Sequence, residues 1–263
     1  MRYDAPSARS SPPGSCPEAV SRSRTCHIHR PLVFAASVSD FEGPRVYSGP
    51  MPAPTKSLGV VLFPRFELLD VFGPLEMLGY VPGLEIVMLA DEAGAVRSTQ
   101  GPAAMAEHRL VDGPPTDLLL VPGGLGTRPL VDDAAFLDRL RERAERAELV
   151  LSVCTGSGLL ARAGLLDGRR ATSNKRAFAW ASAQGSAVTW VKEARWVWDD
   201  KFVTSSGVAA GIDMALAVVG RLAGTEFARS LADQTEYAWQ SDASRDPFAR
   251  IHGLLADDSD GRR

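Results

Sequence analysis

The stretch LVLSVCTGSGLL, residues 149–160, constrains the fold of this chain more than any other. The apolar, β-branched run at 149–153 is typical of a strand that is buried on both faces of a parallel sheet. The small residues after Cys154 allow a tight turn before a helical apolar pattern resumes at Leu159. We therefore expect Cys154 to stand on a sharp strand-to-helix turn, a nucleophile elbow.

The predicted position of Cys154, at the carboxyl end of a strand, is where ligands bind in open α/β sheets. A helix that begins just beyond it would direct N–H groups toward the sulfur and lower the pKa of the thiol, which favours the nucleophilic thiolate. The alternative is a small cysteine buried in the core for packing alone. The turn chemistry around Cys154 favours the functional interpretation.

Composition and charge exclude several classes of protein. The chain has 263 residues, 45% of them hydrophobic and 23% charged, which is typical of a globular protein. Its formal net charge of -3 gives no support to nucleic-acid binding. No apolar stretch approaches the roughly 18 residues of a membrane span, and three cysteines indicate no disulfide framework. We expect a soluble, cytoplasmic protein with neither nucleic acid nor membrane as a partner.

The chain divides by composition into three parts. Residues 1–57 are rich in Ser, Pro and Arg, carry seven Lys/Arg against four Asp/Glu, and show no regular period. This composition predicts a disordered extension. Residues 58–240 are expected to form one α/β domain, and residues 241–263 a polar C-terminal tail that frays.

Four residues of the extension suggest a metal site at first sight: Cys16, Cys26, His27 and His29. Their spacing fits no standard zinc pattern, and a solvated tail is the simpler explanation. We therefore expect neither a metal nor a cofactor.

Strand and helix patterns alternate within residues 58–240, which predicts a doubly wound, mostly parallel sheet with right-handed crossovers. Besides 149–153, the expected strands are 58–63, 84–90 and the apolar part of 117–124, which leads into a Gly-Gly loop. Short strands are expected in 94–108 and at 171–172, 188–191, 195–200 and 202–207. The expected helices are 66–78, interrupted by Gly73 and Pro74, and then 136–147, 159–168, 176–183, 208–222 and 225–239.

A nucleophilic cysteine needs oxyanion donors from neighbouring strand ends. Gly123 and Gly124 follow the strand at 117–121, where a backbone without side chains can aim N–H groups at a ligand. A turn that needs positive φ explains both glycines equally well. The N–H of Thr155 is the second expected donor, by the geometry of an elbow.

Two carboxylates, Glu67 and Asp70, follow the first strand. Asp70 lies within an apolar pattern, so we expect it to be buried or to face a cleft. Burial and a nearby thiolate would raise its pKa and make it a proton donor. A helix N-cap is the alternative, because Asp is favoured at that position. The residues alone do not decide between the two.

Four separated motifs carry a resemblance to a known family: FPRFELLDVFGPLEML, LLLVPGG, SVCTGSGLLARAGLLDGRRAT and TSSGVAAGIDMALAVV. In this order and spacing they resemble the ThiJ/PfpI family of the class I glutamine amidotransferase-like superfamily, over about residues 58–240. The resemblance implies a flavodoxin-like three-layer sandwich that is usually a homodimer. It also implies that Cys154 is the nucleophile and that Asp70 contacts its sulfur.

The aspartate in LLDVFGPLE is similar to that of the isonitrile hydratase branch and of the sensor domains of AraC-type regulators. Those regulators carry a helix-turn-helix domain after this one; only about two dozen residues follow here, so we expect no such domain. Many family members have a histidine where this chain has Asn174, so no Cys-His pair is expected. Asn174, Thr155 and Ser206 are candidates to orient a polar substrate, although each residue type is also common in turns and caps.

The resemblance implies a cofactor-free enzyme for small electrophiles, of the isonitrile hydratase type. Cys154 would attack the isonitrile, Asp70 would deliver a proton, and water would release an N-substituted formamide. Two alternatives stay open: a glyoxalase-like or deglycase-like activity on α-oxoaldehydes, and a non-catalytic dimer that senses oxidants through Cys154. The expected partners are a small-molecule substrate and a second copy of the chain.

Overall fold

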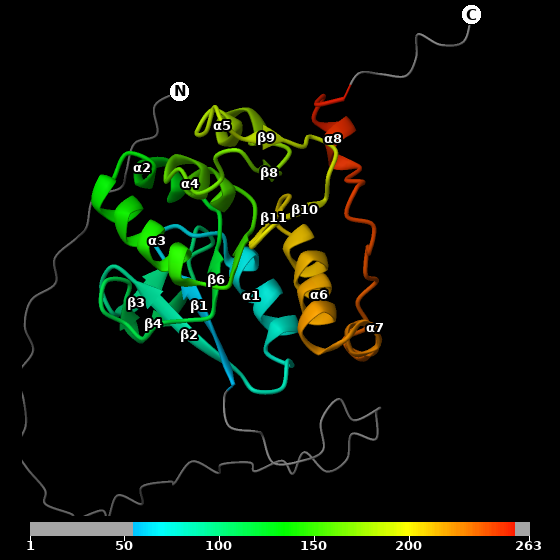
Figure 1. Ribbon diagram of the computed structural model, residues 1–263, viewed down its shortest axis with the longest axis horizontal. Coiled ribbons are helices and arrows are strands. Elements are labelled where there is room, and N and C mark those ends of the chain that lie inside the picture. Colours follow the sequence, from blue (N-terminus) through cyan, green and yellow to red (C-terminus); the bar gives the residue numbers. More distant parts are fainter. Residues whose placement is uncertain (1–54, 256–263) are drawn as a thin grey trace, which may run out of the picture. The chain divides into compact units, whose positions relative to one another are not determined.

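The computed structural model describes residues 55–255, which fold around a seven-stranded sheet (Figure 1). In spatial order its strands are β10 (Trp196–Asp199), β11 (Phe202–Ser205), β7 (Leu149–Ser152), β6 (Leu118–Val121), β1 (Lys56–Val61), β2 (Leu84–Ala90) and β5 (His108–Arg109). β10 pairs antiparallel with β11, and every other neighbouring pair is parallel. Two short pairs lie outside this sheet, β3 (Gly94–Arg97) with β4 (Ala103–Ala106), and β8 (Arg170–Ala171) with β9 (Thr189–Trp190).

Helices cover both faces of the sheet. One group is α1 (Leu68–Leu78), α6 (Ala210–Ala223) and α7 (Thr225–Gln234). The other is α2 (Thr127–Leu130), α3 (Ala134–Arg146), α4 (Gly156–Arg162) and α5 (Phe178–Ser182). Figure 1 shows α3 and α4 on one side of the strands and α1 and α6 on the other. The flavodoxin-like three-layer sandwich is confirmed. No helix within residues 55–255 has the length and apolar character needed to cross a membrane.

The central strands are buried along their length, as their apolar runs predict. Every residue of β6 and β11 is buried, and so are three of the four residues of β7. Because β1, β6 and β7 run parallel, their carboxyl ends meet at one edge of the sheet. The segments that lead from these strands to Asp70, Gly123 and Cys154 leave the sheet at this edge. The fold therefore brings these distant parts of the sequence together.

Helix α1 runs unbroken through Gly73 and Pro74, where the sequence predicted an interruption. Pro74 cannot donate a hydrogen bond to the carbonyl of Asp70, four residues before it. Close packing against α6 compensates, because a Cβ at Gly73 would lie 2.8 Å from Ile212 and a Cβ at Gly211 would lie 3.3 Å from Pro74. The glycines thus allow the two helices to approach, and α1 holds Asp70 in a fixed position.

The C-terminal part of the described chain is more structured than its polar composition indicates. The last amphipathic helix, α7, ends at Gln234 instead of Trp239, and the short helix α8 (Phe248–Ile251) follows. Asp246, before α8, is buried, and its Oδ1 lies 3.7 Å from Nη1 of Arg195. The expected fraying is therefore not seen up to residue 255. The extension as far as residue 54, with the cysteine and histidine cluster, lies outside the described residues.

A buried ion pair ties this C-terminal part to the sheet. The Arg195 Nε donates to Asp213 Oδ2 at 2.6 Å, and the Asp213 side chain is fully buried on α6. Asp213 Oδ1 also accepts from the Tyr237 hydroxyl at 3.1 Å and from the backbone N–H of Gln240 at 2.9 Å. The Asp213 carboxylate on α6 therefore holds together the residue directly before β10 and the part of the chain that follows α7.

We expect Asp213→Ala to lower the free energy of unfolding by about 3 kcal/mol or more, because the buried Arg195 guanidinium would lose its counter-ion. Urea denaturation measures this loss. The control is Asp233→Ala, which removes an exposed carboxylate of α7 and should change stability by about 0.5 kcal/mol or less. Equal effects of the two substitutions would contradict the role given to Asp213.

Candidate active site

Cys154 stands at the sharp turn between β7 and α4, with a φ of 57° that residues other than glycine seldom adopt. Its backbone N–H donates to the Ser206 carbonyl at 3.0 Å. Its carbonyl accepts from the hydroxyls of Ser157 at 3.1 Å and Ser173 at 2.8 Å. Such strain persists only where the surroundings fix it, and it is concentrated at functional sites. The predicted nucleophile elbow is present.

Asp70 lies in the first turn of α1 and is fully buried. The N-cap of this helix is Glu67, so the interpretation of Asp70 as an N-cap is wrong. The backbone N–H of Gly123 donates to Asp70 Oδ2 at 2.9 Å, whereas Oδ1 is buried without a nitrogen or oxygen partner. The Cys154 thiol and this carboxyl group lie close enough for each to shift the pKa of the other. The structure thus places the acid beside the sulfur.

Burial raises the pKa of Asp70 from 3.8 to about 8. The Gly123 N–H, which stabilises the carboxylate, opposes this rise, and the negative charge of Glu67 adds to it. Asp70 therefore holds a proton at neutral pH, which agrees with the sequence argument for a buried acid.

Burial also raises the pKa of the Cys154 thiol well above its ordinary value of 9.0, and the charge of Asp70 raises it further. The residue is only 7% exposed. The N–H groups of Thr155 and Val208 interact with the sulfur and lower the pKa, but they do not offset the loss of solvation. The prediction of a lowered thiol pKa is therefore wrong. The partial positive charges of the N–H groups stabilise the thiolate less than the loss of water around its full negative charge destabilises it.

The N–H groups of Gly123 and Gly124 are both used within the protein. Gly123 holds Asp70, and the Gly124 N–H donates to Thr155 Oγ1 at 3.1 Å. Gly124 has a φ of 125°, and a Cβ there would lie 2.5 Å from the Arg65 carbonyl oxygen. The expected oxyanion role is thus not supported for these two glycines. They allow a close approach of backbones and position the acid and the elbow.

The donors that reach the sulfur are the backbone N–H groups of Thr155 and of Val208, the second of which sequence reasoning missed. The expected role of the Thr155 N–H as an oxyanion donor to a substrate stays a prediction. Val208 has a φ of 37°, a strained conformation for a β-branched residue. No sequence pattern reveals this conformation of Val208, because the residue is the first of an apolar run that predicts a helix. Ser157 and Ser173, which fix the Cys154 carbonyl, were also missed.

Asn174 and Ser206 lie near the elbow, and neither side chain hydrogen-bonds to the thiol within residues 55–255. The Asn174 Oδ1 accepts from the Ala177 N–H at 2.9 Å, which is a capping contact, and its amide packs against Gly207. Ser206 supports Cys154 through its carbonyl. The structure therefore gives both residues positioning contacts, and a role in substrate binding stays a prediction.

Neither described histidine lies at this site. His108 is exposed on β5, which is separated from β7 by three other strands, and His252 is exposed after α8. Within residues 55–255, no cluster of three or more His, Cys, Asp or Glu side chains is arranged to hold a metal ion. The chemistry available next to Cys154 is that of the Asp70 carboxyl group and two backbone N–H groups.

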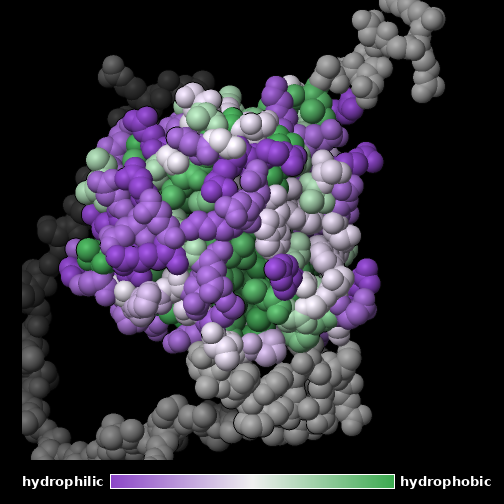
Figure 2. Space-filling model, viewed as in Figure 1, coloured by the Kyte–Doolittle hydropathy of each residue, from purple (hydrophilic) through white to green (hydrophobic). Residues whose placement is uncertain are grey.

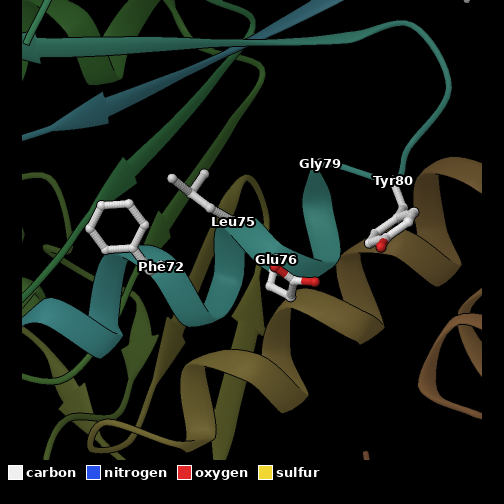
Figure 3. Close-up of a pocket in the computed structure, with 5 residues that line it drawn as sticks. All are labelled: Phe72, Leu75, Glu76, Gly79 and Tyr80. Carbon is white, nitrogen blue, oxygen red and sulfur yellow. The ribbon is translucent and has the colours of Figure 1, made fainter. Parts of the chain in front are cut away.

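A shallow hollow of about 370 Å³ lies elsewhere, on the outer face of α1. The residues that line it are Phe72, Leu75, Glu76, Gly79 and Tyr80 (Figure 3). Figure 2 shows hydrophobic residues gathered over α1, where Leu69 and Phe72 are 40% and 44% exposed. Cys154 does not line this hollow, so we treat it as a surface feature separate from the candidate active site.

Residues 56–221 match the DJ-1/PfpI family. The chain belongs to this family. The matched segment begins in β1 and ends in α6, so it contains both Asp70 and the elbow of Cys154.

Two curated relatives differ in function. Isonitrile hydratase of Pseudomonas putida is 36% identical over 181 residues, which cover 69% of this chain and 78% of that enzyme. The HTH-type transcriptional regulator GbdR of Pseudomonas aeruginosa is 28% identical over 188 residues, which cover 69% of this chain and 51% of the regulator. The family therefore includes an enzyme and regulators.

Solved structures support the fold. A ThiJ/PfpI family protein from Pseudomonas syringae superposes with a TM-score of 0.66 at 30% identity, covering 78% of this chain and 84% of that one. DJ-1beta of Drosophila melanogaster gives a TM-score of 0.61 at 23% identity, covering 70% of this chain and 99% of that one, and shows the fold alone.

We expect the protein to lose stability as pH rises from about 4 to about 8. In this window the native state keeps the proton of Asp70, whereas the unfolded chain releases it above 3.8. Asp70→Asn removes this titration. Its free energy of unfolding, relative to the native protein, should therefore increase across the window by more than about 2 kcal/mol.

Urea denaturation at pH 4.5, 6 and 8 under reducing conditions measures this trend. Asp138→Asn, which neutralises an exposed carboxylate on α3, is the matched control and should give a difference independent of pH. A constant difference for Asp70→Asn as well would show that Asp70 is already ionised in the native state at pH 4.5.

Proposed function

We propose that this protein is a cofactor-free, cysteine-dependent enzyme that adds water to isonitriles and releases N-substituted formamides. The observation that carries the proposal is the buried Asp70 carboxyl group beside the Cys154 thiol. The 36% identity to the isonitrile hydratase of P. putida supports it. Because other relatives are transcriptional regulators, a measurement of isonitrile turnover is the decisive test of this proposal.

The first step is addition to the isonitrile, and it uses the proton that Asp70 and Cys154 share. The terminal carbon of an isonitrile accepts both a nucleophile and a proton. The Cys154 sulfur forms a bond to this carbon, and the proton held by Asp70 moves to the same carbon. The product is a thioimidate, in which the former isonitrile carbon carries one hydrogen and the sulfur, and Asp70 is left as a carboxylate.

The second step releases the product. The Asp70 carboxylate takes a proton from a water molecule as the water oxygen bonds to the thioimidate carbon, and passes this proton to the nitrogen. The new hydroxyl then gives its proton to Asp70 as the carbon–sulfur bond breaks, which releases the formamide and restores the thiolate with a protonated Asp70 beside it. The N–H groups of Thr155 and Val208 stabilise the negative charge that develops on the leaving sulfur.

The geometry favours this reaction over the two alternatives. The glyoxalase-like reaction usually uses a histidine helper, and both described histidines lie away from Cys154. A redox sensor needs an accessible thiol of low pKa. Cys154 is 7% exposed and its pKa is raised, which is the opposite combination.

We also propose, from the family resemblance, that the enzyme is a homodimer. The exposed apolar side chains of α1, Leu69 and Phe72, are candidate contacts, with Tyr80 at the end of this face. Light scattering on the native chain measures its mass in solution.

Cys154→Ala should abolish isonitrile turnover, because no other group in the pair can form the bond to carbon. Asp70→Asn should lower kcat/KM by about 100-fold or more, the usual contribution of a positioned acid. Formamide production from a panel of alkyl and aryl isonitriles measures both effects, with Asp138→Asn as a control of unchanged activity. An active Cys154→Ala variant would overturn the mechanism.

The kcat/KM should rise with pH through about 8. Below this value Asp70 and Cys154 both hold protons, so the pair lacks the thiolate that attacks the substrate. Loss of one proton leaves a single proton shared by the pair, mostly on the sulfur because the pKa of Cys154 is the higher of the two. The tautomer with an anionic sulfur and a protonated Asp70 is the reactive state, and its population rises as the first proton is lost. A pH-rate profile between 5.5 and 9 tests this. A maximum near pH 6 with a decline toward 8 would show that the fully protonated pair is the active form.

A further inference from the structure

Arg128 of α2 lies flat against Trp180 of α5. The guanidinium carbon is 3.4 Å from the centroid of the indole ring, and both side chains are half-buried. A stacked guanidinium keeps its in-plane N–H donors free to bind an anion edge-on. The stacking therefore fixes the orientation of a positive group without using its donors.

No carboxylate pairs with Arg128 within residues 55–255, in contrast to Arg139 and Arg195, which both have aspartate partners. Within residues 55–255 its guanidinium makes one long hydrogen bond of 3.4 Å, from Nη1 to the hydroxyl of the adjacent Thr127. Of the five N–H donors of this guanidinium, only one is thus used within the described part of the chain, and that one makes a weak hydrogen bond. This leaves a half-buried cation with capacity for an external anion.

The stacked pair lies against the elbow. The Thr127 hydroxyl donates to Thr155 Oγ1 at 3.2 Å, and Thr155 directly follows Cys154. Trp180 packs on α4 itself, because a Cβ at Gly158 would lie 2.9 Å from the indole Cζ3. The negative charge of a Cys154 thiolate stabilises the charged form of Arg128 and so opposes the lowering of its pKa by burial. Arg128 and the nucleophile are thus electrostatically coupled.

We propose that Arg128, held by Trp180, binds a carboxylate on the substrate, so that the enzyme prefers electrophiles that carry a carboxylate near the reacting carbon. Among isonitriles, this class is represented by isocyanoacetate and its α-substituted analogues. A guanidinium binds a carboxylate through two parallel N–H donors, which would also orient the substrate. This inference rests on the proposed function for the identity of the reacting group. The anion site itself does not depend on it.

The first test needs no turnover. Iodoacetate and iodoacetamide alkylate a thiol in the same way, with loss of iodide, but only iodoacetate carries a carboxylate. The rates at Cys154 are followed by peptide mass spectrometry, which separates this residue from Cys16 and Cys26. The iodoacetate-to-iodoacetamide rate ratio is divided by the same ratio for glutathione. We expect a normalised ratio of about 10 or more in the native protein, the value of one charge-assisted contact.

Arg128→Gln should reduce this ratio to about 1, and Arg128→Lys should give an intermediate value, because lysine keeps the charge without the planar pair of donors. Arg162→Gln is the matched control: it removes an arginine charge from α4 that pairs with Asp132, and should leave the ratio unchanged. Circular dichroism establishes that each variant is folded. Equal slowing of both reagents in Arg128→Gln would overturn the proposal, since Arg128 would then act on the thiolate alone.

The second test compares isocyanoacetate with its methyl ester. The native enzyme should show a higher kcat/KM for the acid, and Arg128→Gln should lower the acid-to-ester ratio by about tenfold or more. If both isonitriles turn over with equal efficiency in the native enzyme, the carboxylate preference is wrong and the proposed function stands. If no isonitrile turns over while the alkylation ratio holds, the proposed function is wrong and the anion site stands.

Discussion

One buried carboxyl group lies at the centre of the candidate active site. Asp70 is held by the Gly123 N–H at 2.9 Å and has the Cys154 thiol as its neighbour. Water cannot solvate either group in its ionised form, so burial raises the pKa of both. Close together, they cannot both carry a negative charge at low cost, and the pair therefore retains protons at neutral pH. A reaction that moves a proton and forms a bond to sulfur at one carbon suits such a pair.

The sheet and the glycines at its edge make this contact possible. β1, β6 and β7 end side by side, and the loops after them must pack without intervening side chains. A Cβ at Gly123 would lie 2.5 Å from the Thr155 nitrogen, and one at Gly156 would lie 2.2 Å from the Val121 carbonyl oxygen. These glycines serve the close approach of backbones, and the elbow strain at Cys154 is held by the hydrogen bonds that this approach permits.

The sequence alone predicts what depends on local pattern. The apolar runs at 58–63, 117–121 and 149–153 indicate the central strands, and the small residues after Cys154 indicate the elbow. An acid within an apolar pattern makes a buried Asp70 one of two interpretations, and only the structure decides against the helix N-cap. It does not predict the pKa of the thiol, because the sign depends on how completely the fold excludes water. It also misses Val208, whose N–H reaches the sulfur only through a strained φ.

The same limit explains the other differences between expectation and structure. Helix α1 continues through Pro74 because α6 packs against it, and α6 lies more than 130 residues later in the chain. The chain after α7 is ordered through Asp213 and Arg195, whose pairing no local pattern shows. Enzymes and regulators share this family, so the elbow alone does not define a function. We propose that a protonated Asp70, together with Arg128, which has no carboxylate partner within residues 55–255, distinguishes the chemistry of this chain.

Infrared spectroscopy tests the central claim most directly, because a protonated carboxyl group has a carbonyl stretching band that a carboxylate lacks. The account predicts a buried protonated carboxyl band in the native protein at pH 6, absent from Asp70→Asn, that disappears as the pH passes about 8. A native spectrum at pH 6 that shows Asp70 fully ionised would contradict the account.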